Sequence, residues 1–367
     1  RKSKRKRIRM SDSRKAQLND WVNGQLSRLS EMGSVDIELA PVSGDASFRR
    51  YFRAQLPKQS FIAVDAPPDN ENSELFVEIA DYLREAGVKS PKVFAKNYPQ
   101  GFLLIEDFGD RLYLPRLLTL QDGGLDAISE YQVESLYKDA IRALVKIQSN
   151  VDKKRLAPYN REKLRTEMQL FEDWFCEHYL GLDLSAAEHD LIANTFAFLE
   201  EAALGQIQLA VHRDYHSRNL LILDDVQFPE GSGPGIIDFQ DAMAGAYSYD
   251  LVSLLRDCYI RWDRDLVESL AHHYFELASA AGVIEGVSVA QFRRDFDLMG
   301  LQRNFKVMGI FSRLCIRDNK PQYLADIPLV IQYFLEVARK YEEMAPFLDW
   351  FEKNVLINAK AKLNLEL

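Results

Sequence analysis

Hydrophobic positions in the first third of the chain change their period after one helix. Apolar residues recur at helical spacing over residues 12–32, which predicts an amphipathic helix that ends at Gly33. The segments that follow are short, rich in β-branched and aromatic residues, and separated by turn residues, which predicts strands. The predicted strands cover residues 35–42, 47–56, 60–65, 92–97 and 102–107, with one helix over 72–86 after the third strand.

From Leu112 onward the pattern is helical almost to the end of the chain. The predicted helices cover residues 128–150, 161–180, 185–203, 248–260, 264–281, 289–315, 324–340 and 344–361. Two short apolar runs, at 220–223 and 235–239, flank a Pro/Gly-rich turn and predict a hairpin within this helical part. We therefore predict an α+β fold: a five-stranded antiparallel sheet with one helix over residues 10–109, then a mostly helical lobe over 110–367.

Composition agrees with two globular lobes and excludes some partners. The chain has 367 residues, 47% of them apolar, and a net charge of −9, which gives no general attraction to nucleic acid or to an anionic membrane. Residues 1–9 hold seven basic side chains, so the remainder carries −16. We predict that these nine residues are an extension outside the fold; the alternative is a basic tail that binds nucleic acid.

Targeting and redox signals point to the cytoplasm. No stretch approaches the roughly 18 consecutive apolar residues of a membrane span, and no secretory leader follows the basic start. The three cysteines, Cys176, Cys258 and Cys315, lie far apart in apolar patterns, which predicts buried reduced thiols.

One motif carries the chemistry. Residues 212–219 fit H-R-D-x-x-x-x-N, the catalytic loop of phosphoryl-transferring kinases. Asp214 would accept the proton of the attacking hydroxyl, and the amide oxygen of Asn219 would hold Mg²⁺. Asp238, on the far strand of the predicted hairpin, would be the second metal ligand. The alternative is a hairpin whose acids only cap nearby backbone N–H groups.

These residues also carry a family resemblance. The order H-x-D-x-H-x-x-N, then Ile237-Asp238-Phe239, then Asp241, resembles the aminoglycoside phosphotransferase and choline kinase group of small-molecule kinases. The resemblance implies a bilobal, protein-kinase-like fold that binds ATP and Mg²⁺ between its lobes. Gln240 stands where protein kinases have a glycine, which makes a protein kinase the weaker member of this clan.

Further segments narrow the resemblance. They are residues 44–53, 62–68, 104–110 and 301–311. They resemble the bacterial branch of anomeric sugar kinases, which phosphorylate N-acetylmuramate and N-acetylglucosamine at C1 during peptidoglycan recycling. Two rivals stay open. A kinase for aminoglycosides, choline or another amine would suit the charge of −16. A nucleotide-binding pseudokinase would suit the absence of the clan's strand-three lysine.

This sequence differs from the clan in the cation that would contact the nucleotide phosphates. Strand three of this clan presents a lysine to the phosphates, whereas this sequence has Asp65 there. Arg49 or Arg50 could replace the lysine, and period 2 places Arg49 and Arg53 on one face of the strand with Arg50 on the other. The alternative is a solvated strand edge.

The remaining candidates flank the nucleotide and the acceptor. The Ser47 hydroxyl could cover the phosphates, and backbone groups near Glu106 and Phe108 could pair with adenine, unless this segment is a simple linker. His216, Arg218 and Asp241 lie near the proposed base and could contact a polar sugar, while Arg303 could bind an anionic group such as a lactyl carboxylate. For each of these acceptor residues the alternative is a structural role.

Overall fold

The computed structural model describes residues 2–29, 34–42, 48–124, 126–223, 233–363 and 365, with side chains from Ser13 onward. The chain forms two compact units. The first unit comprises Arg1–Asp110 and Leu221–Gln240, and the second comprises Arg111–Leu220 and Asp241–Leu367. Residues 221–240 therefore group with the sheet, whereas the sequence analysis assigned this hairpin to the helical lobe.

The first unit is built on a five-stranded antiparallel sheet in the order β1-β2-β3-β5-β4. The strands are β1 (Ala40–Val42), β2 (Arg50–Gln55), β3 (Ser60–Asp65), β4 (Val93–Asn97) and β5 (Phe102–Glu106). All five predicted strands are confirmed; the third has the predicted bounds and the other four are shorter. The sheet therefore follows the β-branched and aromatic segments of the sequence.

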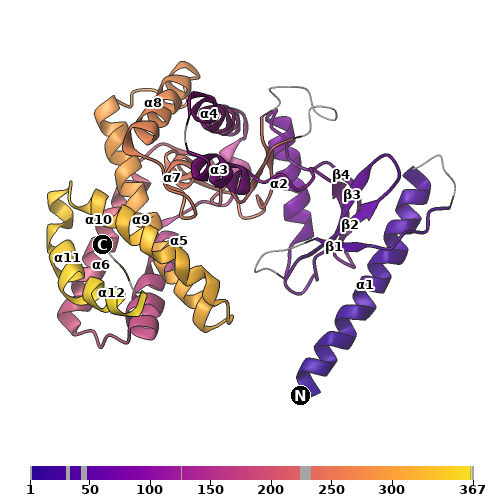
Figure 1. Ribbon diagram of the computed structural model, residues 1–367, viewed down its shortest axis with the longest axis horizontal. Helices are drawn as coiled ribbons and strands as arrows, with labels where there is room; N and C mark the ends of the chain where they lie inside the picture. Colours follow the sequence, from indigo (N-terminus) through magenta and orange to yellow (C-terminus); the bar gives the residue numbers. More distant parts are fainter. Residues whose placement is uncertain are drawn as a thin grey trace. The chain divides into compact units, whose positions relative to one another are not determined.

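Two helices lie on opposite sides of this sheet, α1 (Lys2–Leu29) and α2 (Ser73–Glu85) (Figure 1). Leu18, Val22 and Leu26 of α1 pack on the face that carries Phe52 and other apolar strand residues, which we call the α1 face. The helix begins ten residues before its predicted start, and the predicted end at Gly33 lies outside the described residues. The helix predicted over 72–86 is confirmed as α2, whose first turn is capped by the Asn72 side chain.

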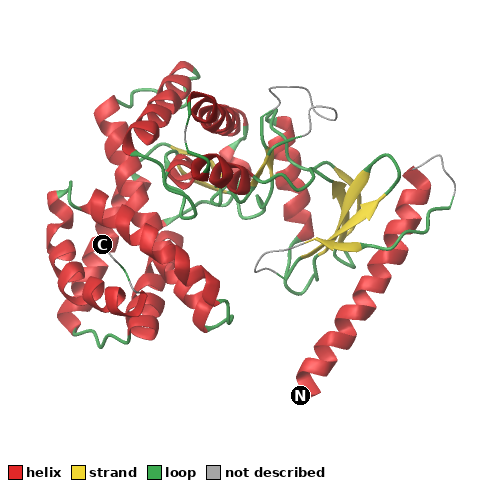
Figure 2. Ribbon diagram, in the orientation of Figure 1, coloured by secondary structure: helices red, strands yellow, loops and turns green. Residues whose placement is uncertain are grey.

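The second unit is mostly helical (Figure 2). Its α-helices are α3 (Tyr113–Asp122), α4 (Ala127–Asn150), α5 (Arg161–Leu170), α6 (Ala186–Leu204), α7 (Tyr249–Leu255), α8 (Arg264–Ala280), α9 (Val289–Ile316), α10 (Ile327–Ala338), α11 (Ala345–Trp350) and α12 (Ile357–Leu363). Short 3₁₀ segments are η1 (Lys153–Arg155), η3 (Pro321–Asp326) and η4 (Glu342–Met344), and π-helical segments are η2 (Phe171–Leu180) and η5 (Phe351–Leu356). The sequence analysis missed α3, whose N-cap residue Leu112 makes no side-chain cap hydrogen bond.

Helix α9 lies at the centre of the second unit's core. It packs against η2, α5, α6 and α10, and its Phe305 makes aromatic contacts with Phe171 and Phe334. Cys176 and Cys258 are buried, unpaired thiols, as predicted, and Cys315 is half-buried. The segment predicted as one helix over 161–180 is α5 continued by the π-helical η2, because the apolar pattern does not distinguish the two windings.

Four short strands interrupt the helices. β6 (Gln208–Val211) pairs with β9 (Met243–Ala246), and β7 (Leu220–Leu221) pairs with β8 (Gly235–Ile236). The β7–β8 pair confirms the predicted hairpin, although residues 224–232 of its turn lie outside the described residues. The β6–β9 pair was not predicted, because neither strand alternates clearly.

Across the described part of the chain, no helix combines the length and the apolar character that crossing a membrane requires.

We predict that Gly309→Ala destabilises the protein by about 2 kcal/mol, because a methyl group there would overpack the core. A Cβ on Gly309 of α9 would lie 2.3 Å from the carbonyl carbon of Leu170. Gly24→Ala is the matched control, since a Cβ there meets nothing within 4 Å and an exposed helical alanine should stabilise by about 0.5–1 kcal/mol. Urea unfolding measures both; equal effects of the two variants would contradict this account of α9.

Candidate active site

Strand β6 leads directly into the loop that carries Asp214. The loop begins at His212, and Arg213 has a left-handed backbone with φ +78°, which is uncommon for a residue other than glycine. His212 and Arg213 are buried and Asp214 is half-buried. Something must therefore hold this backbone conformation and satisfy its buried N–H groups.

Asp250, in the first turn of α7, holds the start of the loop. Its carboxylate accepts hydrogen bonds from the backbone N–H of His212 (2.6 Å) and of Arg213 (2.9 Å), and the residue is completely buried. Burial raises the pKa of Asp250, while His212 and the two N–H donors act in the opposite direction. This carboxylate fixes the turn that brings Asp214 to its place.

Asp257 holds the second half of the loop in the same way. It accepts hydrogen bonds from the backbone N–H of Ser217 (3.0 Å) and from the Ser217 hydroxyl (2.5 Å), while the Ser217 carbonyl accepts from the Leu114 N–H at 3.0 Å. The sequence analysis did not identify Asp250 or Asp257. The available signal was the presence of two acids within the apolar pattern at residues 248–260.

A cluster of buried charges lies against the loop. Arg213 forms an ion pair with Glu167, and Lys306 of α9 lies 3.2 Å from the other oxygen of Glu167 and 2.9 Å from the Tyr249 hydroxyl. Arg303 of α9 donates to the Arg213 carbonyl at 3.1 Å. Three cations and the Glu167 carboxylate thus lie against the loop that Asp250 and Asp257 hold.

The neighbouring cations keep Asp214 ionised. Burial raises the pKa of Asp214, but the charges of Lys306, His216, Arg213 and Arg303 outweigh burial and lower it to about 2. At neutral pH Asp214 is therefore a carboxylate that can accept a hydrogen bond from a hydroxyl group.

The two predicted metal ligands, Asn219 and Asp238, belong to the second and the first unit respectively. Asn219 is buried, and its amide N–H₂ donates to the Asp214 carbonyl at 2.9 Å, which orients the amide. In the first unit, Asp238 has φ +60° and accepts from the Gln240 amide at 2.8 Å, and the adjacent Phe239 packs on Phe76. Amide and carboxylate oxygens are the donors that Mg²⁺ prefers, so both residues fit such an ion.

The predicted nucleotide-side residues lie in the first unit. Arg49 forms a 2.9 Å ion pair with Glu71 and its side chain is 5% exposed, so Arg49 is not part of a solvated strand edge. Arg50 pairs with the buried carboxylate of Asp65. Ser47 lies outside the described residues.

The two residues expected near adenine have protein contacts. The Glu106 carboxylate accepts from the Lys92 backbone N–H at 3.1 Å, and a Cβ on Gly235 would come within 2.7 Å of the buried Phe108 ring. The approach of β8 to Phe108 therefore requires a residue without a side chain at 235. Pairing of this segment with adenine stays a prediction.

Two of the four acceptor candidates come together in the second unit. The Arg218 guanidinium lies 3.8 Å above the Tyr259 ring, and the His216 ring packs against the same tyrosine. Asp241 is exposed, and its backbone carbonyl accepts from Arg213 at 3.3 Å. Arg303 is buried, and its described contact with the Arg213 carbonyl gives it a role in positioning the loop; contact with an acceptor stays a prediction.

Strand β6 leads into a loop with an ionised aspartate and, five residues later, an asparagine. This loop and the antiparallel sheet define a protein-kinase-like phosphotransferase. Residues 38–283 match the family described as the phosphotransferase enzyme family, and the chain belongs to this family. It acts as a small-molecule kinase with a hydroxyl acceptor.

Curated relatives match nearly the whole chain. A protein of Pseudomonas aeruginosa named N-acetylmuramate/N-acetylglucosamine kinase is 37% identical over 91% of this chain and 95% of its own. A protein of the same name from Neisseria meningitidis is 36% identical over 85% of this chain and 89% of its own.

Solved structures share the fold at low identity. A choline kinase from Streptococcus pneumoniae aligns with a TM-score of 0.57 and 11% identity, over 90% of this chain and 99% of that one. An aminoglycoside phosphotransferase with bound ADP aligns with a TM-score of 0.54 and 14% identity, over 86% and 97%. The predicted bilobal kinase fold class is thereby confirmed.

We predict that Asp250→Asn lowers kcat roughly 10- to 100-fold, because one amide oxygen cannot serve both backbone N–H groups and the loop shifts. The melting temperature should fall as well, since a buried donor loses its partner. Asp318→Asn, which removes a surface ion pair with Arg317, is the control and should change neither quantity. Wild-type kcat in Asp250→Asn would show that the loop does not need this carboxylate.

We further predict that no acid limb due to Asp214 appears in the pH–rate profile between pH 4.5 and 8. Its pKa of about 2 lies below the ordinary value of 3.8, so the carboxylate stays ionised there, and its linked stability is lost only as pH falls below 3.8 towards 2. Lys306→Met removes a nearby positive charge, so the Asp214 pKa should rise and the acid limb should move upward in pH. Lys306→Arg keeps the charge and should keep the wild-type profile; an identical shift in both variants would contradict the electrostatic cause.

Proposed function

We propose that this protein is an ATP-dependent kinase that phosphorylates the anomeric C1 hydroxyl of N-acetylmuramate and N-acetylglucosamine. The observation that carries the proposal is the ionised Asp214 on a loop held by two buried carboxylates, in a chain 36–37% identical to kinases named for these two sugars. The ionised Asp214 on its fixed loop supports the chemistry, and the identity to the two named kinases supports the substrate.

The proposed transfer is a direct displacement. The C1 oxygen attacks the γ-phosphorus of ATP, the bond from that phosphorus to the bridging oxygen breaks, ADP leaves, and the hydroxyl proton passes to Asp214. A carboxylate with a low pKa is a weak base, but an anomeric hydroxyl is more acidic than an ordinary alcohol, and phosphoryl transfer depends mainly on position and charge. The loop's rigid attachment supplies that position.

We propose that Asn219 and Asp238 hold Mg²⁺, which would supply positive charge to the phosphates. Support for this comes from their oxygen donors, from their order in the motif, and from the orientation of the Asn219 amide by the Asp214 carbonyl. We place the enzyme in the cytoplasm, where ATP is available, and its products would feed the reuse of cell-wall sugars.

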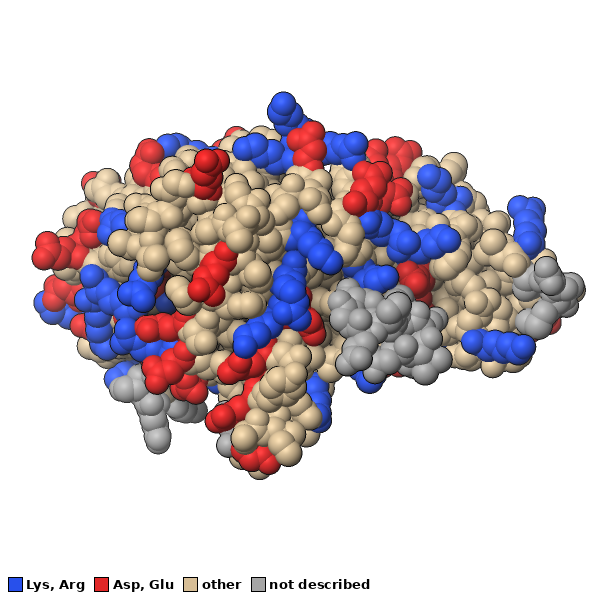
Figure 3. All heavy atoms as spheres, turned by 90° about the horizontal axis from the view of Figure 1, so that it is seen from above, with Lys and Arg blue, Asp and Glu red and all other residues tan. Residues whose placement is uncertain are grey.

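An amine kinase is the second candidate. The charge of −16 beyond residue 9 favours cationic substrates, and the choline kinase and aminoglycoside phosphotransferase share the fold. On the face shown in Figure 3, however, basic and acidic side chains are interspersed. The charges that lower the pKa of Asp214 come from basic side chains, and their proximity to the proposed base disfavours a cationic acceptor. The pseudokinase alternative is disfavoured by the same site, because a protein that only binds nucleotide needs no ionised base.

The proposal predicts ADP release with the two amino sugars and not with amines. Purified protein is incubated with ATP, Mg²⁺ and N-acetylmuramate, N-acetylglucosamine, choline or kanamycin, and phosphorus NMR locates the phosphate. We expect sugar 1-phosphates, and we expect Asp214→Asn to reduce turnover at least 100-fold while ADP binding is retained.

The outcomes separate the candidates. Release of ADP only with choline or kanamycin would assign the protein to the amine kinases. Nucleotide binding without turnover on any acceptor would identify a pseudokinase, and a phosphate on another hydroxyl would disprove the anomeric assignment.

A further inference from the structure

The aspartate found in place of the strand-three lysine lies on the same sheet face as Arg50 and on the face opposite to Arg49. Cross-strand register pairs Asp65 with Arg50 and Ala63 with Phe52, so Asp65 lies on the α1 face of the sheet. There its carboxylate accepts from Arg14 of α1 at 3.0 Å and from Arg50 at 2.9 Å. Both guanidinium groups use two nitrogens on this buried carboxylate. Arg14 thus fastens α1 to the sheet through Asp65, and Arg50 of β2 pairs with the same carboxylate.

The opposite face carries Arg49 and Arg53, as the alternation along β2 requires. Arg53 binds two carboxylates, Asp107 at 2.6 Å and Asp110 at 2.7 Å, so the local charge around it is negative. Arg49 pairs with the Glu71 carboxylate, and its guanidinium lies 5.4 Å over the Phe76 ring of α2. A guanidinium carries five N–H donors, so one carboxylate can orient it without exhausting its capacity to bind phosphate oxygens.

Arg49 also lies in the neighbourhood of the predicted metal ligand. Burial raises the pKa of Tyr51 to about 12, and the charges of Arg49, Asp238 and Glu71 all act on that hydroxyl. Independently, Phe76 beneath Arg49 packs against Phe239, the residue after Asp238, with ring centroids 4.9 Å apart. The Arg49–Phe76 and Phe76–Phe239 contacts therefore place the Arg49–Glu71 pair in the same part of the first unit as Asp238.

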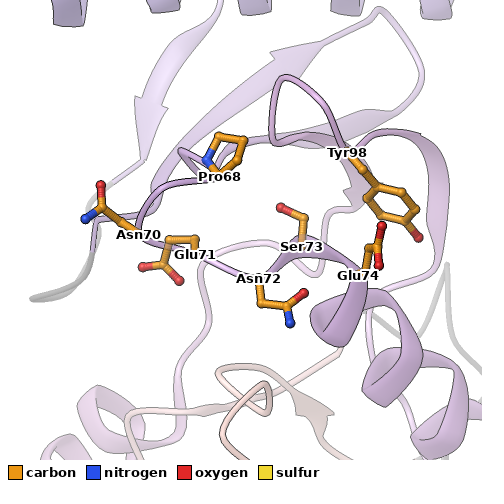
Figure 4. Close-up of a pocket in the computed structure, with 7 residues that line it drawn as sticks. All are labelled: Pro68, Asn70, Glu71, Asn72, Ser73, Glu74 and Tyr98. Atoms are coloured by element: carbon orange, nitrogen blue, oxygen red, sulfur yellow. The ribbon is translucent and has the colours of Figure 1, made fainter.

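Glu71 comes from the loop between β3 and α2. Figure 4 shows it beside Asn70 and Asn72, at the rim of a hollow that Pro68 and Tyr98 also line. The loop is held by backbone hydrogen bonds from Asn70 and Glu71 to the Pro67 carbonyl, at 2.9 and 3.0 Å. Glu71 is thus fixed before α2 begins, and the Glu71 side chain is 13% exposed.

We propose that Arg49, oriented by Glu71, is the cation that contacts the nucleotide phosphates in this chain, and that Arg50 is structural. The inference rests on the proposed use of ATP, and it assigns the phosphate contact to the strand before the usual one. Kinases of the clan hold their phosphate-binding lysine with a glutamate, and here an arginine and a glutamate from a loop would form the corresponding pair. Arg49 would be the binding residue and Glu71 a positioning residue.

Affinity for Mg²⁺–ADP, measured by calorimetry without an acceptor, tests the assignment. We expect Arg49→Ala to weaken ADP binding about 10- to 100-fold, the worth of one or two charge-assisted hydrogen bonds, and Arg49→Lys to weaken it less. Glu71→Gln should weaken binding roughly tenfold, and the double variant should bind no more weakly than Arg49→Ala alone, because Glu71 acts through Arg49. A melting temperature for each variant confirms folding.

Arg14→Ala is the matched control, because it removes an arginine from a buried carboxylate on the α1 face. We expect it to lower the melting temperature and leave ADP affinity within about twofold of wild type. Arg50→Ala tests the rival residue: a loss of ADP affinity there, with wild-type affinity in Arg49→Ala, would overturn the assignment. Because no acceptor is present, a wrong sugar would not alter these results, whereas absence of ADP binding in the wild type would refute the proposed function itself.

Discussion

Buried carboxylates that accept hydrogen bonds from backbone N–H groups are the constraint on which the catalytic loop depends. Asp250 and Asp257 replace the partners that a regular strand or helix would have given to residues 212, 213 and 217. A buried carboxylate is costly unless it is paired or hydrogen-bonded, and excess negative charge near the base would hinder binding of phosphate groups. The cations on α9 offset that charge. Helix α9, at the centre of the second unit's core, brings Arg303 and Lys306 to the loop.

The sheet of the first unit also keeps its charged side chains paired with groups of opposite charge. Each face carries arginines, and each arginine of β2 that is described above has an acidic partner, from Asp65 on one face to Asp107 on the other. Pairing keeps long side chains in one geometry, which a site for a flexible triphosphate needs.

The sequence predicted the features that depend only on residues close together in the chain. Short segments rich in β-branched and aromatic residues located the strands, period 2 placed Arg49 and Arg50 on opposite faces, and the spacing from Asp214 to Asn219 identified the loop. Contacts between distant segments could not be read in this way. Glu167, Lys306 and Asp250 meet the loop from positions 36 to 92 residues away from Asp214 in the sequence, and nothing in their own segments marks them as its partners. Helix α3 was missed because its N-cap residue offers no side-chain hydrogen bond, and the π-helical winding of η2 was missed because an apolar pattern does not distinguish it from an α-helix.

Helix α1 changes what counts as the minimal kinase unit. The family match begins at residue 38, whereas Leu18, Val22 and Leu26 cover a whole face of the sheet and Arg14 neutralises Asp65 beneath it. A chain begun at the family boundary would expose that apolar face to water together with a carboxylate that has lost one of its two cations. The segment before the family's own first residue is therefore part of the folding unit, and sequence comparison confined to the shared family region would overlook it.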